Sequence, residues 1–566
     1  VRDVVAPDLD VLARHVTVKR ARDSTARAVR IISFANFNPV VSKTPQSPTN
    51  AWCNEEDNDT GGRWAANARA VVHERTGTDE STGETSSVAL AMGFAAKEQA
   101  HHIGVDTYAG ETGEAASAYD DAEDGQLSGN GAVAGQADAA VADELSLRRR
   151  TARTTVFLSA AFTAREALSA LNRARDQGAR AIARRKSAWW SSWLRTARLP
   201  KDAPRVVTRV AKRSLVSIRQ AIDTQHSMIV ASIATQPPYG VDWIRDGAYI
   251  NHALDTARRH AIVEAHNDRY ADLQATATDK PRGQPATPSG NWAQNYYADG
   301  VAAGPLPYSI DETGFGIWTL WDHYVQTRDR DYLFEDGVYG AIQRAAHYLT
   351  DQPPFGCVDP TTNLQCVANE GDNENPSQTL VGAQAVWLGL DSAVRAAEVR
   401  GAPAEQNQAD WRERRDELGA AIETHFFNQE CNCFTEDPQT GGTLLWPVRF
   451  VVYGTPRADA QAEVNWRHMV AAMSGELDRG RYETKVLLGN AYAWAGRPAK
   501  IRQVKDGLDW VARVPTTPTG LLGEAWMEFP ADSGQIVTMV AQPHATSHAL
   551  FYLAALKAYG SERYRF

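Results

Sequence analysis

The stretch TLVGAQAVWLGLDSAVRAAEVR, residues 379–400, decides the class of the C-terminal part of the chain. Its apolar residues recur every three or four positions, which is the spacing of one face of an α-helix, as at Val386, Leu390, Val394 and Ala397. The stretch therefore predicts a long amphipathic helix.

The same helical spacing of apolar residues continues on both sides of this stretch, from Pro204 to the end of the chain. We expect helices over about 204–223, 246–258, 260–277, 311–328, 331–351, 379–400, 405–427, 458–474, 482–497, 499–513 and 545–559. No strand-like runs alternate with them, which excludes a parallel α/β domain. Helices joined by long Gly-, Pro- and Trp-rich loops predict a closed helical toroid, and such long loops are usually functional.

The first 160 residues have a different sequence pattern. Short β-branched and aromatic runs, such as VRIISFANFNPVV (29–41) and TTVFLSAAF (154–162), alternate with turn-forming residues and predict an antiparallel β-sandwich over 1–160. The acidic, small-residue-rich stretch 109–145 is expected to be surface loop. Residues 161–203 are rich in Ala, Leu and Arg and predict a helical linker to a second domain over 204–566.

Charge and cysteine content limit the possible partners. The 59 basic and 69 acidic residues give a net charge of −10, which argues against nucleic-acid or anionic-membrane partners. Of five cysteines, Cys357 and Cys366 flank a short loop that a disulfide could close, Cys431 and Cys433 are one residue apart, and Cys53 is alone. Free thiols in a reducing compartment fit this pattern as well, although we favour a secreted or periplasmic setting.

The segment VDWIRDGAY, residues 241–249, combines three residue types that suit a sugar ligand. The Asp246 carboxylate can accept hydrogen bonds from neighbouring hydroxyls, Arg245 can donate to them, and Trp243 can stack on a pyranose ring. A helix N-cap aspartate beside a surface arginine is the alternative reading.

Aromatic residues gather in SGNWAQNYYADG (289–300), just before DETGFGIW (311–318). Trp292, Tyr296 and Tyr297 could form an aromatic wall. Asp311 could bind a sugar or cap the helix that follows.

Two further loops carry carboxylates suited to acid–base chemistry. In VANEGDNENPSQT (367–379), like charges and partial burial would raise a carboxyl pKa, as a general acid requires, although helix N-termini also attract acidic residues. In GLLGEAWMEF (520–529), Glu524 beside Trp526 could hold a water as general base. His544 and His548 are four residues apart, but without an HExxH glutamate we expect a structural role, and neither metal nor cofactor.

Together and in this order, these motifs resemble glycoside hydrolase family 15, the inverting glucoamylases and glucodextranases. WIRDGAY resembles the family's Trp-x-Arg-Asp block, and Trp292 with DETGFGIW resembles its second block. NEGDNENPSQTL resembles the general-acid block, and GLLGEAWMEF with QPHATSHALFYLAAL resembles the general-base block and closing helix. The resemblance implies an (α/α)6-barrel catalytic domain behind a β-sandwich and a helical linker, and exo-acting release of glucose from α-glucans with inversion.

Carried over residue by residue, the resemblance makes Glu370 the general acid and Glu524 the general base. It implies a substrate-binding set composed of Trp243, Arg245, Asp246, Trp292, Asp311, Arg481 and Trp526, with Arg245 and Asp246 on the terminal sugar, Trp292 as stacking platform and Arg481 in GRYE as a sugar ligand.

Two positions depart from the family pattern. Asn369-Glu370-Gly371 lacks the family's Trp and second Glu, so Glu374 is a rival for the acid. Glu524 precedes Ala where the family has Gln, which affects the expected sugar specificity.

Other functions fit part of this pattern. An inverting disaccharide phosphorylase of the same architecture would need a phosphate pocket where Glu524 stands, so hydrolysis is favoured. A carbohydrate-binding protein that has lost its acid remains an alternative. A polysaccharide lyase would need cationic and Tyr/His chemistry around a uronate, which the acidic loops argue against.

Overall fold

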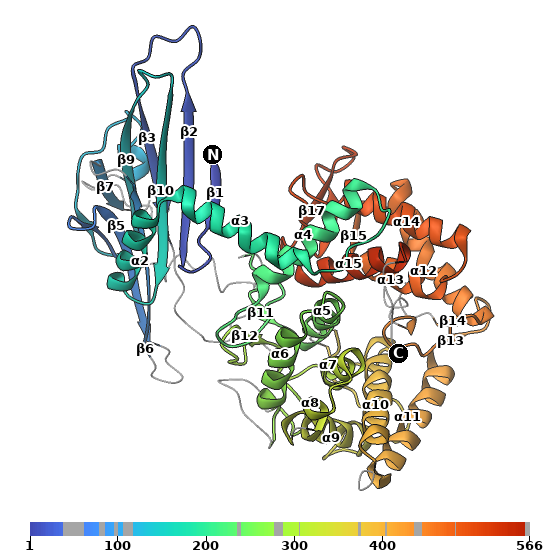
Figure 1. Ribbon diagram of the computed structural model, residues 1–566. Helices are drawn as coiled ribbons and strands as arrows, with labels where there is room; N and C mark the ends of the chain where they lie inside the picture. Colours follow the sequence, from blue (N-terminus) through green and yellow to red (C-terminus); the bar gives the residue numbers. More distant parts are fainter. Residues whose placement is uncertain are drawn as a thin grey trace. The chain divides into compact units, whose positions relative to one another are not determined.

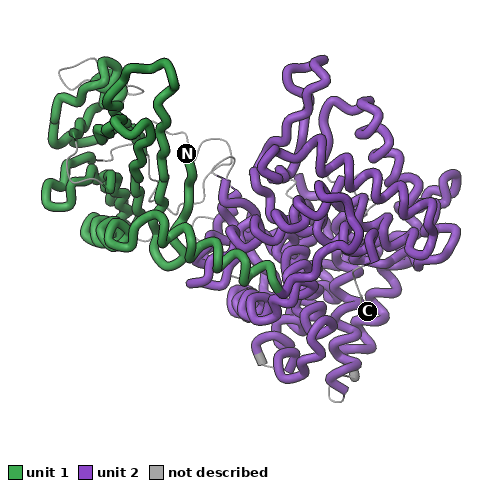
Figure 2. The backbone as a smooth tube through the Cα atoms, turned by 45° about the horizontal axis from the view of Figure 1, so that its top comes forward, with its two compact units in different colours: residues 1–44, 49–195 green, residues 45–48, 196–566 purple. Residues whose placement is uncertain are grey.

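The computed structural model describes residues 1–37, 61–78, 85–95, 100–105, 117–234, 239–276, 287–304, 306–334, 336–371, 375–401, 405–434, 444–481 and 483–560. The chain forms two compact units, residues 1–44 with 49–195 and residues 45–48 with 196–566 (Figures 1 and 2).

The first unit is built on two antiparallel sheets. The larger sheet has the order β1-β2-β10-β6-β5-β4-β8 and the smaller one the order β3-β9-β7. Their strands are β1 (Arg2–Val5), β2 (Val11–Lys19), β3 (Ala28–Asn36), β4 (Gly61–Ala65), β5 (Ala70–Thr78), β6 (Thr85–Phe94), β7 (Ala100–Val105), β8 (Ala132–Val133), β9 (Ala137–Ser146) and β10 (Thr151–Ala161). In the larger sheet, Phe157 of β10 pairs with Ala13 on one side and Gly93 on the other.

The two sheets share one hydrophobic core. Val71 and Met92 from the larger sheet pack with Ile103 and Val141 from the smaller sheet, and all four are buried. Burial of apolar side chains between two sheet faces is the main stabilising contribution to such an arrangement.

The expectation of a surface loop over 109–145 is wrong where β9 runs. Ala137, Ala139 and Val141 are fully buried, and β9 pairs with β3 and β7. These alanines pack in the core between the two sheets. A stretch rich in alanine lacks the large apolar side chains that usually indicate a strand, so its sequence resembles a surface loop. The short helix α1 (Ala118–Asp121) precedes it, whereas residues 106–116 lie outside the described residues.

Two helices follow the last strand and belong to the first unit. Helix α2 (Ala164–Gln177) is capped by Thr163, whose hydroxyl accepts a hydrogen bond from the Glu166 amide. Leu171 and neighbouring alanines of α2 join the core of the larger sheet. Helix α3 (Ala179–Arg195) then leads to the second unit, so the structure groups the helices expected as a linker with the sheets.

The second unit is helical, and its helices confirm the sequence-predicted ones to within a few residues. They are α4 (Arg205–Ala221), α5 (Ile244–Thr256), α6 (His260–Leu273), α7 (Ile310–Thr327), α8 (Arg330–Phe334), α9 (Asp336–Thr350), α10 (Leu380–Arg400), α11 (Glu405–Phe426), α12 (Pro456–Ser474), α13 (Glu483–Ala493), α14 (Pro498–Arg513) and α15 (Ala545–Ala558). The helix expected over 331–351 is divided into α8 and α9.

Burial divides these helices into an inner and an outer group. Helices α5, α7, α10, α13 and α15 are buried on most of their faces, and contacts run from α10 through α7, α5 and α15 to α13. Helices α4, α6, α12 and α14 each bury one stripe and contact these inner helices. The inner helices therefore form the core of the unit.

An aromatic cluster fills the space between the inner helices. The Trp446 ring lies 5.8 Å from Trp318 of α7, 5.9 Å from Tyr249 of α5, and stacks at 5.8 Å on Tyr492 of α13. Trp446 comes from the segment between α11 and α12, so this segment contributes to the core although its described residues 444–453 form no α-helix.

Short strands and two disulfides organise the loops. Strand β11 (Val241–Asp242) pairs with β12 (Tyr296–Tyr297), β13 (Phe427–Asn428) pairs with β14 (Cys433–Phe434), and β15 (Arg479–Arg481), β16 (Ala525–Glu528) and β17 (Ile536–Met539) form a three-stranded sheet. Disulfides join Cys357 to Cys366 and Cys431 to Cys433, whereas Cys53 lies outside the described residues. Among the helices of the described chain, none has the length and apolarity to cross a membrane.

Helices α7 and α10 cross at Gly314, where a Cβ atom would lie 2.1 Å from the Ala385 carbonyl oxygen. We expect Gly314→Ala to lower the free energy of unfolding by ~1–3 kcal/mol, because backbone on both sides must move. Gly337→Ala in α9 is the control, since its Cβ would meet only Ala271 at 3.9 Å. Urea unfolding measures both, and equal stabilities would contradict the prediction.

Candidate active site

The loop that leads into α5 is anchored by a buried aspartate. Asp242 of β11 is fully buried and accepts hydrogen bonds from the Ile229 amide at 2.7 Å, His266 Nε2 at 2.8 Å and the Tyr270 hydroxyl at 2.6 Å. These bonds fix the residue that precedes Trp243, and α5 begins at Ile244. The backbone is therefore held in place two residues before the first turn of α5.

Arg245, in that first turn, joins α5 to α7. Its Nη1 lies 2.5 Å from Asp311 Oδ2 and 3.2 Å from Glu312 Oε1, and its amide donates to the Glu312 carboxylate. Both carboxylates are completely buried in the first turn of α7, where the helix N-terminus also favours negative charge.

Asp311 also holds the loop that carries Glu370. Its Oδ1 accepts hydrogen bonds from Ser309 Oγ at 2.5 Å and from the Gly371 amide at 3.0 Å. Although burial raises the pKa of Asp311, Arg245 and these two donors hold it below its ordinary value. Asp311 is therefore an ionised link between α5, α7 and the 369–371 loop.

Asp246 faces the start of α15. Its Oδ1 accepts a hydrogen bond from Thr546 Oγ1 at 2.5 Å and lies 3.5 Å from His544 Nε2. Burial acts to raise its pKa, but His544, Arg245 and Thr546 lower it to about 2. Asp246 thus remains a hydrogen-bond acceptor at any physiological pH.

The two C-terminal histidines have different hydrogen-bond partners. His548 is buried, with Nδ1 3.0 Å from Ser214 Oγ and Nε2 accepting from the Leu522 amide at 3.1 Å. Burial lowers the pKa of His548 to about 3, so it is neutral. His544 caps α15 by accepting from the Ser547 amide. Among the described residues, no group of His, Cys, Asp and Glu side chains could hold a metal ion.

Glu524 stands just before β16 and is held by two groups. The Tyr239 hydroxyl donates to one carboxylate oxygen, and Arg481 forms an ion pair with the other. Arg481 ends β15, which pairs with β16. A cavity of about 20 Å³, enough for one water molecule, lies beside Glu524 and is also lined by Thr538, Ser547 and Trp526.

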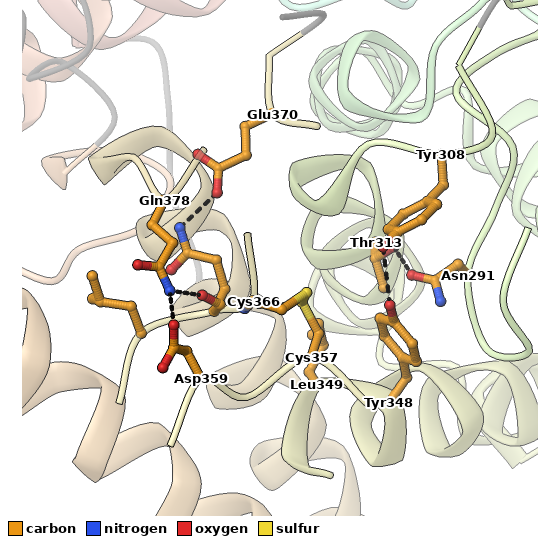
Figure 3. The surroundings of a disulfide bond; sticks show 12 residues. Asn291, Tyr308, Thr313, Tyr348, Leu349, Cys357, Asp359, Cys366, Glu370 and Gln378 are labelled. Atoms are coloured by element: carbon orange, nitrogen blue, oxygen red, sulfur yellow. Dashed lines mark hydrogen bonds between the residues drawn. A yellow bond between two sulfur atoms is a disulfide. The ribbon is translucent and has the colours of Figure 1, made fainter. Parts of the chain in front are cut away.

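Glu370 is placed against the N-terminus of α10 (Figure 3). Only 3% of its surface is exposed, its Oε1 accepts from Gln365 Nε2 at 2.7 Å, and its Oε2 accepts from the Thr379 amide at 2.8 Å and from the Thr379 hydroxyl. A Cβ atom on Gly382 would lie 2.2 Å from Oε1, so the carboxyl group packs directly on the first turn of the helix. Burial raises the pKa of Glu370 to about 7, against the opposing effect of these hydrogen bonds.

A chain of contacts connects the neighbourhoods of the two glutamates. It runs from Gly371, beside Glu370, through Asp311 and Arg245, whose Nε lies 3.9 Å from Asp246 Oδ2. From Asp246 it continues to His544, whose ring centroid lies 5.9 Å from that of Tyr239, and Tyr239 contacts Glu524. The structure therefore brings Arg245, Asp246, Asp311, Glu524 and Arg481 into one network, whereas Glu374 lies outside the described residues.

The tryptophans of the predicted set differ in exposure. Trp292 is fully buried and donates from Nε1 to the Tyr270 carbonyl at 2.7 Å, so its ring has no face open to a sugar, and we correct its expected role as stacking platform to a core residue. Trp526 is 3% exposed and packs edge-to-face on Trp510 at 5.6 Å. Trp243 is half-buried, with its ring 5.4 Å from that of Tyr239.

Three site residues are absent from the sequence-based set. Tyr239 contacts Glu524 from a distant part of the chain. Lys485 follows Arg481 by four residues in GRYETK, and its Nζ lies 6.0 Å from the centroid of the Tyr249 ring. Burial and Arg245 lower the pKa of Lys485 to about 7. The Tyr249 hydroxyl is buried and has no hydrogen-bond partner among the described residues. The position of Lys485 four residues after Arg481 was the available signal.

We expect Arg245→Met to lower the free energy of unfolding by ~3–5 kcal/mol, because it leaves two buried carboxylates without their cation. Arg412→Met is the control, since the pair of Arg412 with Glu398 is half exposed and worth less than ~1 kcal/mol. Urea unfolding measures the free energy of unfolding of both variants. An equal decrease in Arg245→Met and Arg412→Met would contradict the prediction that the buried ion pairs of Arg245 stabilise the fold more than the exposed pair of Arg412.

Comparison with known proteins finds a curated relative of part of the chain and solved structures of similar fold. No family model matches the chain. An uncharacterized glycosyl hydrolase of Methanocaldococcus jannaschii is 29% identical over 140 residues, which are 25% of this chain and 20% of that relative. A bacterial glucoamylase complexed with acarbose has a similar fold, with a TM-score of 0.64 at 13% identity over 98% of this chain and 81% of that one. The glucoamylase from Saccharomycopsis fibuligera covers 64% of this chain at 12% identity, with a TM-score of 0.43. The similarity to the bacterial glucoamylase shows that the chain has a glucoamylase-like fold.

Proposed function

We propose that the protein is an exo-acting, inverting glycoside hydrolase that releases a monosaccharide, glucose by family resemblance, from the non-reducing end of α-linked saccharides. The observation that carries the proposal is the pair of carboxylates in contrasting environments. Glu370 is buried on a helix N-terminus with its pKa raised to about 7, and Glu524 is ion-paired with Arg481 and bonded to Tyr239.

Glu370 acts as the general acid. A carboxyl group with a pKa near neutrality is half protonated at pH 7 and can give its proton to the glycosidic oxygen as the bond breaks. Glu370 is followed by Gly371, whose amide donates to Asp311, and Asp311 is ion-paired with Arg245. The acid is therefore held next to the residues that bind the terminal sugar.

Glu524 acts as the general base. It removes a proton from a water that attacks the anomeric carbon on the face opposite the leaving group, and its contacts with Tyr239 and Arg481, which hold the carboxylate in one orientation, support this role. Inversion requires ~6.5–9.5 Å between the two carboxyl groups so that the water fits, against ~5–5.5 Å in retaining enzymes.

The terminal sugar is bound by five residues, which are Trp243, Arg245, Asp246, Arg481 and Lys485. Asp246, with its pKa of about 2, accepts hydrogen bonds from hydroxyls, while the cations donate. Asp311 is buried and forms an ion pair with Arg245, and Trp526 is buried on β16, the strand that pairs with the strand of Arg481. The acarbose bound to the glucoamylase of similar fold supports a carbohydrate ligand.

We also infer that the first unit is a β-sandwich and the second an (α/α)6 barrel. Along the chain, the outer helices α4, α6, α9, α11, α12 and α14 alternate with the inner helices α5, α7, α10, α13 and α15. The alternation is interrupted between α11 and α12, where the segment carrying Trp446 contributes to the core. This segment takes the place of the sixth inner helix.

The function is tested by incubating the protein with maltose, isomaltose, kojibiose, nigerose and trehalose and following products by NMR. We expect release of monosaccharide whose first anomer is β, at a rate independent of phosphate. Turnover that depends on phosphate would indicate a phosphorylase, and binding without turnover would indicate a carbohydrate-binding protein.

Glu370→Gln and Glu524→Gln are each expected to lower kcat by ~10²–10⁴-fold, the usual contribution of one acid or base. Glu476→Gln, on the exposed residue after α12, is the matched control and keeps full activity. Thermal unfolding of all three verifies that loss of activity is not loss of structure. Full activity in either site variant would remove that residue from its role.

The pH dependence of kcat/KM has an expected alkaline limb. Because Glu370 must be protonated and its pKa is about 7, activity is retained below pH 7 and falls as the pH rises through that value. The pKa of Lys485 is also about 7, so Lys485→Met is measured in parallel. If the limb disappears in Lys485→Met, the lysine and not the glutamate sets it.

A further inference from the structure

The loop before Glu370 is closed by a disulfide that draws two backbone segments together (Figure 3). Cys357 bonds to Cys366, the Cys366 amide donates to the Cys357 carbonyl at 3.0 Å, and Val358 forms an antiparallel bridge with Gln365. The Cys357 amide in turn donates to the Tyr348 carbonyl of α9 at 2.8 Å. The loop is thus a rigid unit attached to the helical core.

Gln365 lies at the end of this loop and is fully buried. Its Nε2 donates to Glu370 Oε1 at 2.7 Å and to the Thr379 carbonyl at 3.0 Å, which fixes which side of the amide faces the carboxyl group. Its backbone carbonyl accepts from Gln378 Nε2 at 2.7 Å. The side chain and the backbone of Gln365 are therefore both held.

These contacts leave one place for the acidic proton. A carboxylate offers about four lone-pair positions. On Glu370, Thr379 occupies two on Oε2 with its amide and hydroxyl, and Gln365 occupies one on Oε1. Among the described residues, the remaining position is on Oε1, beside the Gln365 amide.

We propose that Gln365, held by the Cys357–Cys366 loop, is a positioning residue that orients the Glu370 carboxyl group and directs its proton to Oε1. The inference rests on the proposed function, in which Glu370 is the acid. The amide is neutral and donates from one side, so it fixes the rotation of the carboxyl group while adding no charge. A structural role alone would fix the loop without affecting the proton affinity of Glu370.

The test replaces Gln365 by leucine, which is similar in size and donates no hydrogen bond. Loss of a donor to the carboxylate disfavours the ionised form, so the alkaline limb of kcat/KM is expected to move to higher pH by ~0.5 unit or more. We expect kcat to fall about 10-fold at the optimum, with KM changed less than about 2-fold, because only proton delivery is impaired.

Gln378→Leu is the matched control. Gln378 bonds to Asp359, Thr362 and the Gln365 carbonyl, and none of its described bonds reaches Glu370. We expect this variant to lower the melting temperature without moving the alkaline limb. An unchanged limb and kcat in Gln365→Leu, or equal shifts in the two variants, would overturn the proposal.

The disulfide is tested by the double variant Cys357→Ser/Cys366→Ser, with Cys431→Ser/Cys433→Ser as the control for the other described disulfide. We expect the first to reproduce the limb shift of Gln365→Leu and the second to leave the limb in place. A folded Cys357→Ser/Cys366→Ser variant with the limb and kcat of the parent would show that the disulfide does not support Gln365. If this variant does not fold, Gln365→Leu still decides the role of the amide.

A direct titration separates this inference from the proposed function. Carbon-13 NMR of labelled glutamate side chains, assigned to Glu370 with the Glu370→Gln variant, gives its pKa in the full chain whether or not any saccharide is hydrolysed. A higher pKa in Gln365→Leu supports the positioning role even if the parent shows no turnover. An unchanged pKa overturns it even if the parent is an active hydrolase.

Discussion

The bonding of Arg245 to the two carboxylates that begin α7 is the interaction on which the rest of the site depends. Asp311 and Glu312 are completely buried, and such carboxylates are tolerated only with a cation and further hydrogen bonds. Arg245 supplies the cation from α5, and Asp311 extends the link to the Gly371 amide. Three segments that are far apart in the sequence are therefore fixed relative to one another by one guanidinium group.

Around this link, the environment separates the pKa values of neighbouring carboxyl groups. Asp246, bonded to Thr546 and close to His544, has its pKa lowered to about 2, whereas buried Glu370 has its pKa raised to about 7. Divergent values of this kind allow one site to hold a permanent acceptor and a proton donor at the same pH. The difference comes from the partners of each group, since helix N-termini lie close to both.

The sequence pattern was sufficient for most of the helices because their apolar faces are long and periodic, as in 379–400. It failed for β9, whose buried alanines resemble a loop, and for Trp292, because a tryptophan next to tyrosines in a loop says nothing about its burial. In the site, Arg245, Asp246, Asp311, Arg481 and Glu524 stand in recognisable motifs and do form one network. Tyr239, 285 residues from Glu524, and Gln365, in the loop that the Cys357–Cys366 disulfide closes as the sequence allowed, depend on three-dimensional proximity, which composition and spacing do not encode.

The packing of Trp446 against Trp318, Tyr249 and Tyr492 has a consequence for how a polymer could be processed. All four rings are buried, so the space between the inner helices is filled with side chains at this level. In the proposed function, a saccharide end that reaches the first turns of α5 and α7 would meet this packed layer and would have to withdraw by the way it entered. Each released monosaccharide would then leave only after the shortened chain had moved away.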